Sequence, residues 1–157
     1  MVNADLSFQT MYRANLSGAN LKGADMRHSI IDGSNLTGAN LSGADLTGAG
    51  LGNTNLSNAN LKGANLSCDD RGCVNLRRAN LSGADVTGAD LSYATLLGAN
   101  LKDANLQGAN LSYADLSYAK LTSADLKGAN LYRANLDDVI DADLTGALNV
   151  PAEYSKD

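Results

Sequence analysis

Few residues carry reactive side chains, and they are not gathered in the sequence. His28 is the only histidine, and Cys68 and Cys73 are the only cysteines. A metal site or an acid–base pair needs partner groups at matching positions, and no such arrangement with serine, cysteine or paired carboxylates is visible. We expect His28 to be a solvent-exposed side chain in a turn. The sequence therefore predicts no catalytic, cofactor-binding or metal-binding residues, no cofactor and no enzymatic activity.

Cys68 and Cys73 lie five positions apart. Two cysteines are too few for a disulfide-stabilised scaffold, and the further Cys or His ligands of a structural zinc site are missing. We interpret both residues as free thiols. A strained local disulfide between them is the alternative.

Asp and Asn recur in a five-residue repeat, and this repeat must position all the remaining side chains. The repeat runs through residues 4–138 without a change of frame, as in Ala14-Asn15-Leu16-Ser17-Gly18, and its middle position is apolar in 26 of 27 units. Inward Ala, outward Asn or Asp and inward Leu alternate as in a short strand, whereas a period of five would spread the Leu residues around a helix. Frequent Gly in the fifth position favours turns. The sequence therefore predicts a bend after every three-residue strand.

A slower period of twenty residues indicates four sides per coil. Asn occupies one column of this period and Asp most of a neighbouring one: Asn20, Asn40, Asn60, Asn80 and Asn100, and Asp5, Asp25, Asp45, Asp85 and Asp125. Successive coils should pair at the ordinary strand spacing of about 4.8 Å, which gives roughly seven coils. One coil buries too little apolar surface to be stable alone, so stacking must supply the stability.

Tandem Ala-(Asn/Asp)-Leu-X-X units of this kind resemble the pentapeptide-repeat family, which is abundant in cyanobacteria and represented among quinolone-resistance proteins. The resemblance covers residues 4–138. It implies an all-β fold, a right-handed quadrilateral β-helix with Leu and the preceding small residue stacked inside. We expect one solenoid over residues 1–157, with regular repeats at 4–138, an irregular unit at 69–73 and a C-terminal cap at 139–157.

The irregular unit 69–73 places Asp69 and Arg71 at inward positions. Burying unpaired charge is prohibitive, so the unit must bulge or leave its side open to water. Keeping it in the coil aligns Asn60 with Asn80, so we expect it to occupy one side in a distorted form. We interpret it as a joint between two halves of thirteen regular units. A recognition loop is the alternative.

The two ends of the solenoid differ in their predicted caps. After residue 138 the frame slips by three residues, and four apolar residues are expected to plug the C-terminal opening: Val139, Ile140, Leu148 and Val150. Only three residues precede the repeat, with Phe8 and Met11 as bulky candidates for covering the first coil. An exposed strand edge invites pairing, so we expect an end-to-end homodimer through the N-terminal coil.

Tyr93 and Tyr113 lie twenty residues apart, with Arg133 next in the same column. We expect a stacked surface ladder with a cation–π contact. A docking patch for a partner is the alternative. The Asn column is similarly expected to be structural, with side-chain amides bonded along the stack.

The net charge of −5 argues against affinity for nucleic acid or an anionic membrane. No apolar stretch is long enough to span a bilayer, and the repeat begins at Ala4, which leaves no room for a signal peptide, so we expect a cytoplasmic protein. The expected function is a non-catalytic structural or interaction scaffold that presents a mildly acidic surface to an unidentified protein partner, with no direct nucleic-acid binding and no membrane contact.

The alternative function, implied by the resemblance, is a DNA-mimic inhibitor or modulator of a type II topoisomerase, DNA gyrase. Asn65 and Asn105 interrupt the Asp column, and Lys22, Lys62 and Lys102 are expected to form a basic column beside it. Charges of opposite sign within a Debye length of about 8 Å cancel in part. We therefore expect no strong inhibition of gyrase.

Overall fold

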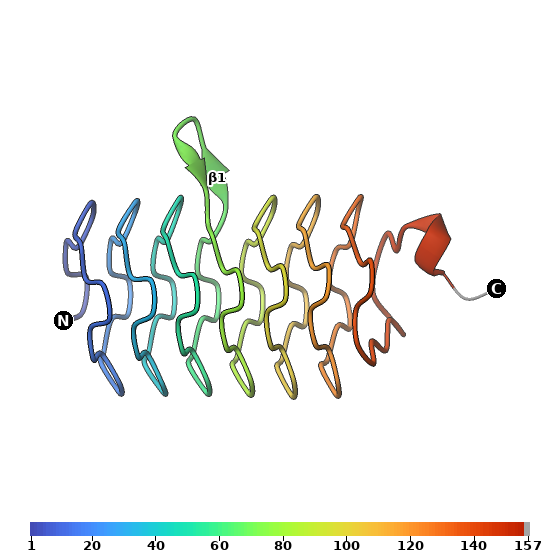
Figure 1. The fold of residues 1–157 in the computed structure, drawn as a ribbon, viewed down its shortest axis with the longest axis horizontal. Helices are drawn as coiled ribbons and strands as arrows, with labels where there is room; N and C mark the ends of the chain where they lie inside the picture. The colour runs from blue at the N-terminus through green and yellow to red at the C-terminus, as the bar shows by residue number, and fades with distance from the viewer. Residues whose placement is uncertain (156–157) are drawn as a thin grey trace.

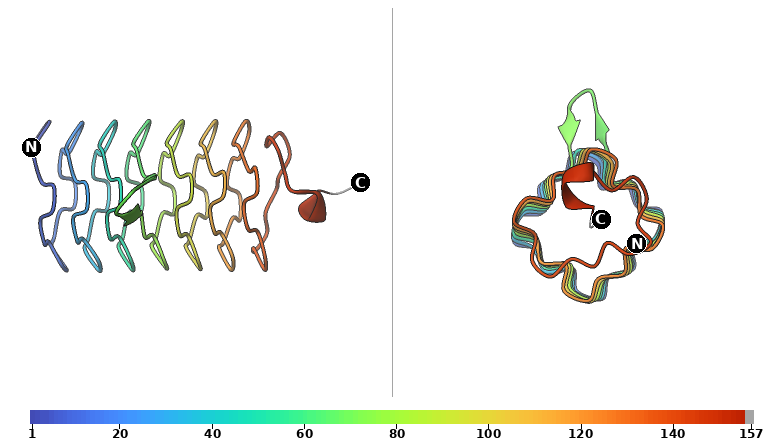
Figure 2. Two further views of the ribbon diagram at one scale, coloured as in Figure 1. Left: turned by 90° about the horizontal axis from the view of Figure 1, so that it is seen from above. Right: turned by 90° about the vertical axis from the view of Figure 1, so that its right-hand side faces the viewer.

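Alternation of inward Ala and Leu with outward Asn or Asp produces one parallel β-bridge on each side of each coil. In the computed structural model, which describes residues 1–155, Asp5 pairs with Asp25 and Asn20 with Asn40. The chain therefore stacks coil upon coil, with its two termini at opposite ends (Figure 1). The end-on view shows the four sides of each coil (Figure 2). The predicted four-sided β-helix with a twenty-residue period is confirmed.

Each side closes with a turn that the outward Asn or Asp helps to form. The Leu21 N–H donates to the Asn40 carbonyl at 2.7 Å, and the Ala24 N–H donates to the Leu21 carbonyl at 3.0 Å. Between them Gly23 has a φ of 65°, in the left-handed region. The Asn40 side chain accepts the Ser42 N–H at 3.1 Å, and the same contact recurs along the chain. An amide or carboxylate oxygen at this position thus serves the turn locally, which explains why Asn and Asp alternate freely there.

The core is a single column of Leu and Ala side chains inside the coils. Leu21, Leu61 and Leu106 are fully buried. The alanines two positions before the last two of them, Ala59 and Ala104, are buried as well. At a few inward positions a hydroxyl replaces Ala, and it is satisfied by the backbone: Ser34 Oγ donates to the Met11 carbonyl at 2.7 Å. The predicted inward orientation of the repeat's middle position is therefore confirmed.

The irregular unit leaves the coil as a hairpin. Strand β1 (Cys68–Asp69) pairs antiparallel with β2 (Gly72–Cys73), with Cys68 opposite Cys73 and Asp69 opposite Gly72. The hairpin projects from one corner of the solenoid (Figures 1 and 2).

Bridges that cross the hairpin show that it lies outside the stack. Asn55 pairs with Asn80 and Asn60 with Asp85, twenty-five residues apart, whereas the spacing elsewhere in the regular repeats is twenty. The expectation that unit 69–73 occupies one side of its coil is therefore wrong. The unit leaves the stack because its inward positions would carry charge, and the hairpin keeps that charge in water. Looping out five residues, one whole unit, preserves the frame of the repeat.

The surface columns change with this register. Asn80 and Asn100 continue the column of Asn15, Asn35 and Asn55. The predicted column from Asn20 to Asn100 is therefore wrong, but five Asn residues, from Asn15 to Asn100, are stacked on the neighbouring side before Lys120 continues that column. Its amides are bonded along the stack in part, as between Asn100 Nδ2 and Asn80 Oδ1 at 3.1 Å.

The predicted charge columns are also divided. Asp45 is followed by Asn65 and then Asp90, and Asp85 lies on the next side, so the predicted Asp column does not exist as one line. Lys102 lies beside Ser82, in the column of the Asn ladder, on a different side from Lys62. The predicted basic column is wrong for the same reason.

The last coil is shorter than the others and ends in a 3-10 helix, η1 (Ala152–Tyr154). Lys120 pairs with Ile140, but Asn130 pairs with Leu148, eighteen residues away. Ile140 and Leu148 therefore take outward positions and are 43% and 53% exposed, so their predicted role as a plug is wrong. Inward positions fall to other residues, including Val139 and Val150, which pack against the core. Within the described part of the chain, no helix is long and apolar enough to cross a membrane.

Candidate interaction surface

One corner of the solenoid gathers most of the exposed aromatic side chains and the hairpin. We call it the hairpin corner. It comprises Tyr132, the hairpin β1–β2 and the stacked turn residues of successive coils: Phe8, His28, Gly48, Cys68, Tyr93, Tyr113 and Arg133. Adjacent coils hold these turns in line. The Tyr93 N–H donates to the Ser112 carbonyl at 2.9 Å, and the Tyr113 N–H donates to the Tyr132 carbonyl at 2.8 Å.

The hairpin folds back over the coil of Gly48 and docks on the two coils before that one. His28 Nε2 lies 2.9 Å from Asp69 Oδ2, and its ring stacks on Phe8 with 5.1 Å between centroids. The Arg71 guanidinium lies 5.4 Å from the Phe8 ring centre. The His28 side chain is only 15% exposed, so the expectation of a solvent-exposed histidine is wrong. The hairpin covers it, and Asp69 is forty-one residues away in the sequence.

Asp69 also shapes the hairpin turn. Its Oδ1 accepts the backbone N–H groups of Arg71 at 2.9 Å and Gly72 at 3.2 Å. The Arg71 N–H, and to a lesser degree the His28 contact, hold the pKa of Asp69 below its ordinary value despite some desolvation. The carboxylate is therefore a charged cap for the turn and an acceptor for His28.

Cys68 and Cys73 form a disulfide at the base of the hairpin. The interpretation as free thiols is therefore wrong, and the alternative of a local disulfide holds. The loop-out of unit 69–73 brings the two residues face to face as partners in the β1–β2 register.

The aromatic ladder lies on the other side of the hairpin. The Tyr93 and Tyr113 rings are stacked, with centroids 4.6 Å apart and 2° between planes. Tyr132, which sequence reasoning missed, meets Tyr113 edge-on at 5.5 Å, and Arg133 lies 5.4 Å from the Tyr132 ring centre and 5.8 Å from that of Tyr113. The predicted ladder with a cation–π contact is confirmed. Its rings remain accessible, with Tyr93 52% and Tyr132 45% exposed.

The corner lacks an arrangement that would support metal binding. Among residues 1–155, no group of three or more His, Cys, Asp or Glu side chains is placed to hold a metal ion. His28 is engaged with Asp69, and both cysteine sulfurs are in the disulfide. What the corner offers is aromatic surface with the guanidinium groups of Arg71 and Arg133, the kinds of side chain that anchor protein–protein contacts.

The side that carries Asp5, Asp25 and Asp45 is partly neutralised by Arg27, which lies on the same side. Arg27 bonds Asp25 through two contacts, Nε to Oδ1 at 2.9 Å and Nη2 to Oδ2 at 2.6 Å, and its Nε lies 3.9 Å from Asp45 Oδ2. Hydrogen bonding to Arg27 lowers the pKa of Asp25. The basic group beside the Asp residues is therefore Arg27, not a lysine column.

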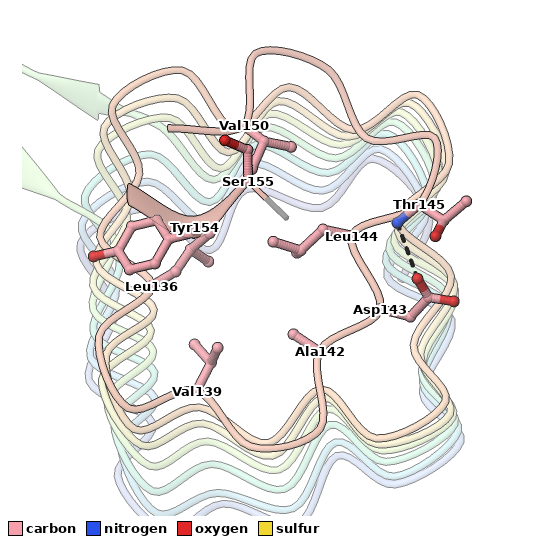
Figure 3. Close-up of a pocket in the computed structure, with 9 residues that line it drawn as sticks. All are labelled: Leu136, Val139, Ala142, Asp143, Leu144, Thr145, Val150, Tyr154 and Ser155. Atoms are coloured by element: carbon pink, nitrogen blue, oxygen red, sulfur yellow. Dashed lines mark hydrogen bonds between the residues drawn. The ribbon is translucent and has the colours of Figure 1, made fainter. Parts of the chain in front are cut away.

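A hollow lies at the C-terminal mouth of the solenoid. Its volume is about 470 Å³, and apolar side chains line much of it, among them Leu136, Val139, Leu144 and Val150 (Figure 3). Tyr154 stands beside the opening with its hydroxyl donating to Asp137 Oδ1 at 2.6 Å. The hollow is the end of the core column, incompletely closed by the shortened last coil.

Comparisons with known proteins agree with this architecture. The family of pentapeptide repeats matches the chain in eight copies, over residues 1–38, 39–68, 73–108 and 99–138. Comparison with curated proteins finds no match. The matched ranges leave out the hairpin residues 69–72.

Solved structures of similar proteins include two with matching overall geometry. A pentapeptide repeat protein from the thylakoid lumen of Arabidopsis thaliana is 31% identical over 68% of this chain and 71% of that chain, with a TM-score of 0.63. Rfr23 from the cyanobacterium Cyanothece 51142 is 26% identical over 86% and 89%, with a TM-score of 0.62.

HetL from the cyanobacterium Nostoc sp. strain PCC 7120, a pentapeptide repeat protein involved in heterocyst differentiation regulation, is 37% identical over 94% of this chain and 73% of that chain, with a TM-score of 0.42. The fold of such proteins is the right-handed quadrilateral β-helix. The repeat match covers most of the chain, and so the chain belongs to the pentapeptide-repeat family.

Proposed function

We propose that the protein is a non-catalytic scaffold that docks a cytoplasmic protein partner at the hairpin corner. The observation that carries this proposal is the gathering of exposed aromatic rings, two arginines and the projecting hairpin along a single edge. Another corner carries only glycine after Asn3 of the first coil, from Gly23 through Gly43, Gly63, Gly88 and Gly108 to Gly128.

Rigidity supports this role. Neighbouring coils fix the positions of Tyr93, Tyr113 and Tyr132 by backbone hydrogen bonds, so little conformational freedom is lost when a partner covers their rings. Tyr and Arg are also the residues most often found as energetic anchors of interfaces. The partner surface that fits is an apolar patch with carboxylate groups placed to meet Arg71 and Arg133.

Affinity capture with two matched variants tests the proposal. Tyr93→Ser with Tyr113→Ser removes the exposed rings, whereas Lys102→Ser with Asp103→Ser neutralises an exposed ion pair elsewhere and leaves the net charge unchanged. We expect the corner variant to lose a protein that the wild type and the control variant retain. With that protein purified, its Kd should rise at least about tenfold, a loss of about 1.4 kcal/mol. Equal binding by all three forms would contradict the proposal.

We also propose end-to-end self-association through the N-terminal coil. Leu6, Met11 and Leu16 are only partly buried, whereas their counterparts in the next coil are fully buried. A second copy that covers them would bury apolar surface and pair the open strand edge. Light scattering at rising concentration should show a dimer. A strictly monomeric mass at high concentration contradicts this part of the proposal.

The alternative function, DNA mimicry directed at gyrase, has one supporting observation, the stacked Asp5, Asp25 and Asp45. Arg27 lies among these residues, and Asn65 follows them in the column. A mimic needs a continuous acidic face, so this function ranks second.

A further inference from the structure

We propose that the Cys68–Cys73 disulfide is a reversible redox switch that holds the hairpin β1–β2 in its docked position. The effect on partner binding rests on the proposed function, because the hairpin is part of the same corner. The switch itself concerns only this chain and can be tested without a partner.

The disulfide joins two residues that the solenoid presents at the foot of the hairpin. Each strand contributes only two residues, and an isolated hairpin of this size is not stable in water. The hairpin therefore depends on the disulfide, on the turn that Asp69 caps and on its contacts with the preceding coils.

Those contacts are few and lie at the surface. They consist of the pair His28–Asp69 and the Arg71 guanidinium over Phe8. A single hydrogen bond between partly exposed side chains contributes little to stability, because water competes for both groups. Without the disulfide, these contacts alone must orient the hairpin, so its docked population should fall.

Cys73 is exposed and Cys68 is half-buried, so a reductant reaches Cys73 first. A thiolate of a dithiol reductant attacks Cys73 Sγ, the Sγ–Sγ bond breaks, and Cys68 leaves as a thiolate. The second thiol of the reductant then attacks the reductant sulfur that is bonded to Cys73 Sγ, and the Cys73 thiolate is released. Two protons are taken up, and the reductant departs as a disulfide. Exchange with another disulfide restores the bond by the reverse steps.

The site accommodates the reduced state without rearrangement of the core. Cys68 Sγ lies 3.9 Å from the carbonyl oxygens of both Ser92 and Tyr93, so a reduced Cys68 thiol has acceptors in place. Reducing compartments keep most cysteine pairs as thiols, so in a cytoplasmic protein oxidising conditions would raise the docked population of the hairpin.

Limited proteolysis reads the switch directly, because Arg71 is a trypsin site between the two cysteines. We expect cleavage after Arg71 to be at least about fivefold faster in dithiothreitol than in the air-oxidised protein, since cleavage follows the population of the open form. Chains cut in the oxidised form stay joined until they are reduced. Thiol titration should find no free thiol before reduction and two after it.

The control is Cys68→Ser with Cys73→Ser. With and without dithiothreitol, this variant should be cut as fast as the reduced wild type. Circular dichroism should show the same solenoid in every form. Equal cleavage of oxidised and reduced wild type, or two free thiols in the air-oxidised protein, would overturn the switch.

Partner capture in both redox states separates this inference from the proposed function. Capture that depends on the corner tyrosines and changes with redox state supports both. Capture that depends on those tyrosines but ignores redox state overturns the regulatory role and leaves the docking proposal intact. Capture unaffected by the tyrosines overturns the docking proposal, while the cleavage rates still decide the switch.

Discussion

At the scale of single residues, the repeat makes most side chains predictable because each one is decided locally. Leu101 is inward and 1% exposed, as its place in the unit requires. The outward Asn and Asp residues cap their own turns two residues later, which needs no distant partner. The environments of His28 and the two cysteines do not follow from the repeat, because their partners are set by the hairpin, for which the five-residue period carries no signal.

Leu101→Asp should destabilise the solenoid strongly, because it places a carboxylate inside the Leu column. We expect a loss of at least about 3 kcal/mol from buried charge and lost apolar contact. Lys102→Asp, one residue on, changes an exposed side chain and should shift the free energy of unfolding by less than about 0.5 kcal/mol. Thermal unfolding followed by circular dichroism compares them. Wild-type melting of Leu101→Asp would show that this side chain is not inward.

The charge state of Asp69 gives a second residue-level prediction. Because folding lowers its pKa, its contribution to hairpin docking is present above its ordinary pKa of about 3.9 and is lost as the pH falls through the lower, folded value. A carbon-13 titration of the Asp69 carboxyl should therefore have a midpoint below 3.9. His28→Ala should raise that midpoint only in part, since the Arg71 N–H has the larger effect. An ordinary midpoint in the wild type would contradict the turn capped by Asp69, and a midpoint that His28→Ala leaves unmoved would contradict the docking of Asp69 on His28.

At the scale of elements, the looped-out hairpin could not be deduced from column alignment. A five-residue insertion leaves every later Leu inward, so both registers satisfy the core, and the surface columns favoured the wrong one. The charges at Asp69 and Arg71 were the better signal, because charge does not enter a Leu column. Ile140 is exposed because it keeps the regular twenty-residue register opposite Lys120, which is an outward position, whereas Leu148 is turned outward because the last coil omits two residues.

Deleting residues 69–73 together with Cys68→Gly should leave the solenoid intact, because Gly suits the turn that joins directly to Val74. We expect a melting temperature within about 5 °C of the wild type. Removal of Asp103 alone is the contrasting variant, since a one-residue slip turns later inward side chains outward. Failure of the five-residue deletion to fold cooperatively would mean that the hairpin is part of the stack.

At the scale of the whole molecule, the charge arrangement argues against DNA mimicry. The net charge is −5, but the stacked Asp5, Asp25 and Asp45 share their side with Arg27, and the column changes to Asn65. We expect no inhibition of gyrase supercoiling at low-micromolar protein. Inhibition that disappears when Asp5, Asp25 and Asp45 become Asn would reverse the ranking of the two functions.

The most direct test of the docking scaffold is site-specific photocrosslinking inside the source cells. A benzoylphenylalanine in place of Tyr113 puts the probe on the hairpin corner, and one in place of Ser123 puts it two corners further round the coil. The probe at position 113 should give a discrete protein adduct that the probe at position 123 does not give, and Tyr93→Ser in the same chain should weaken it. Adducts of equal yield from both positions, or none from position 113, would contradict the assignment of the hairpin corner as the docking surface.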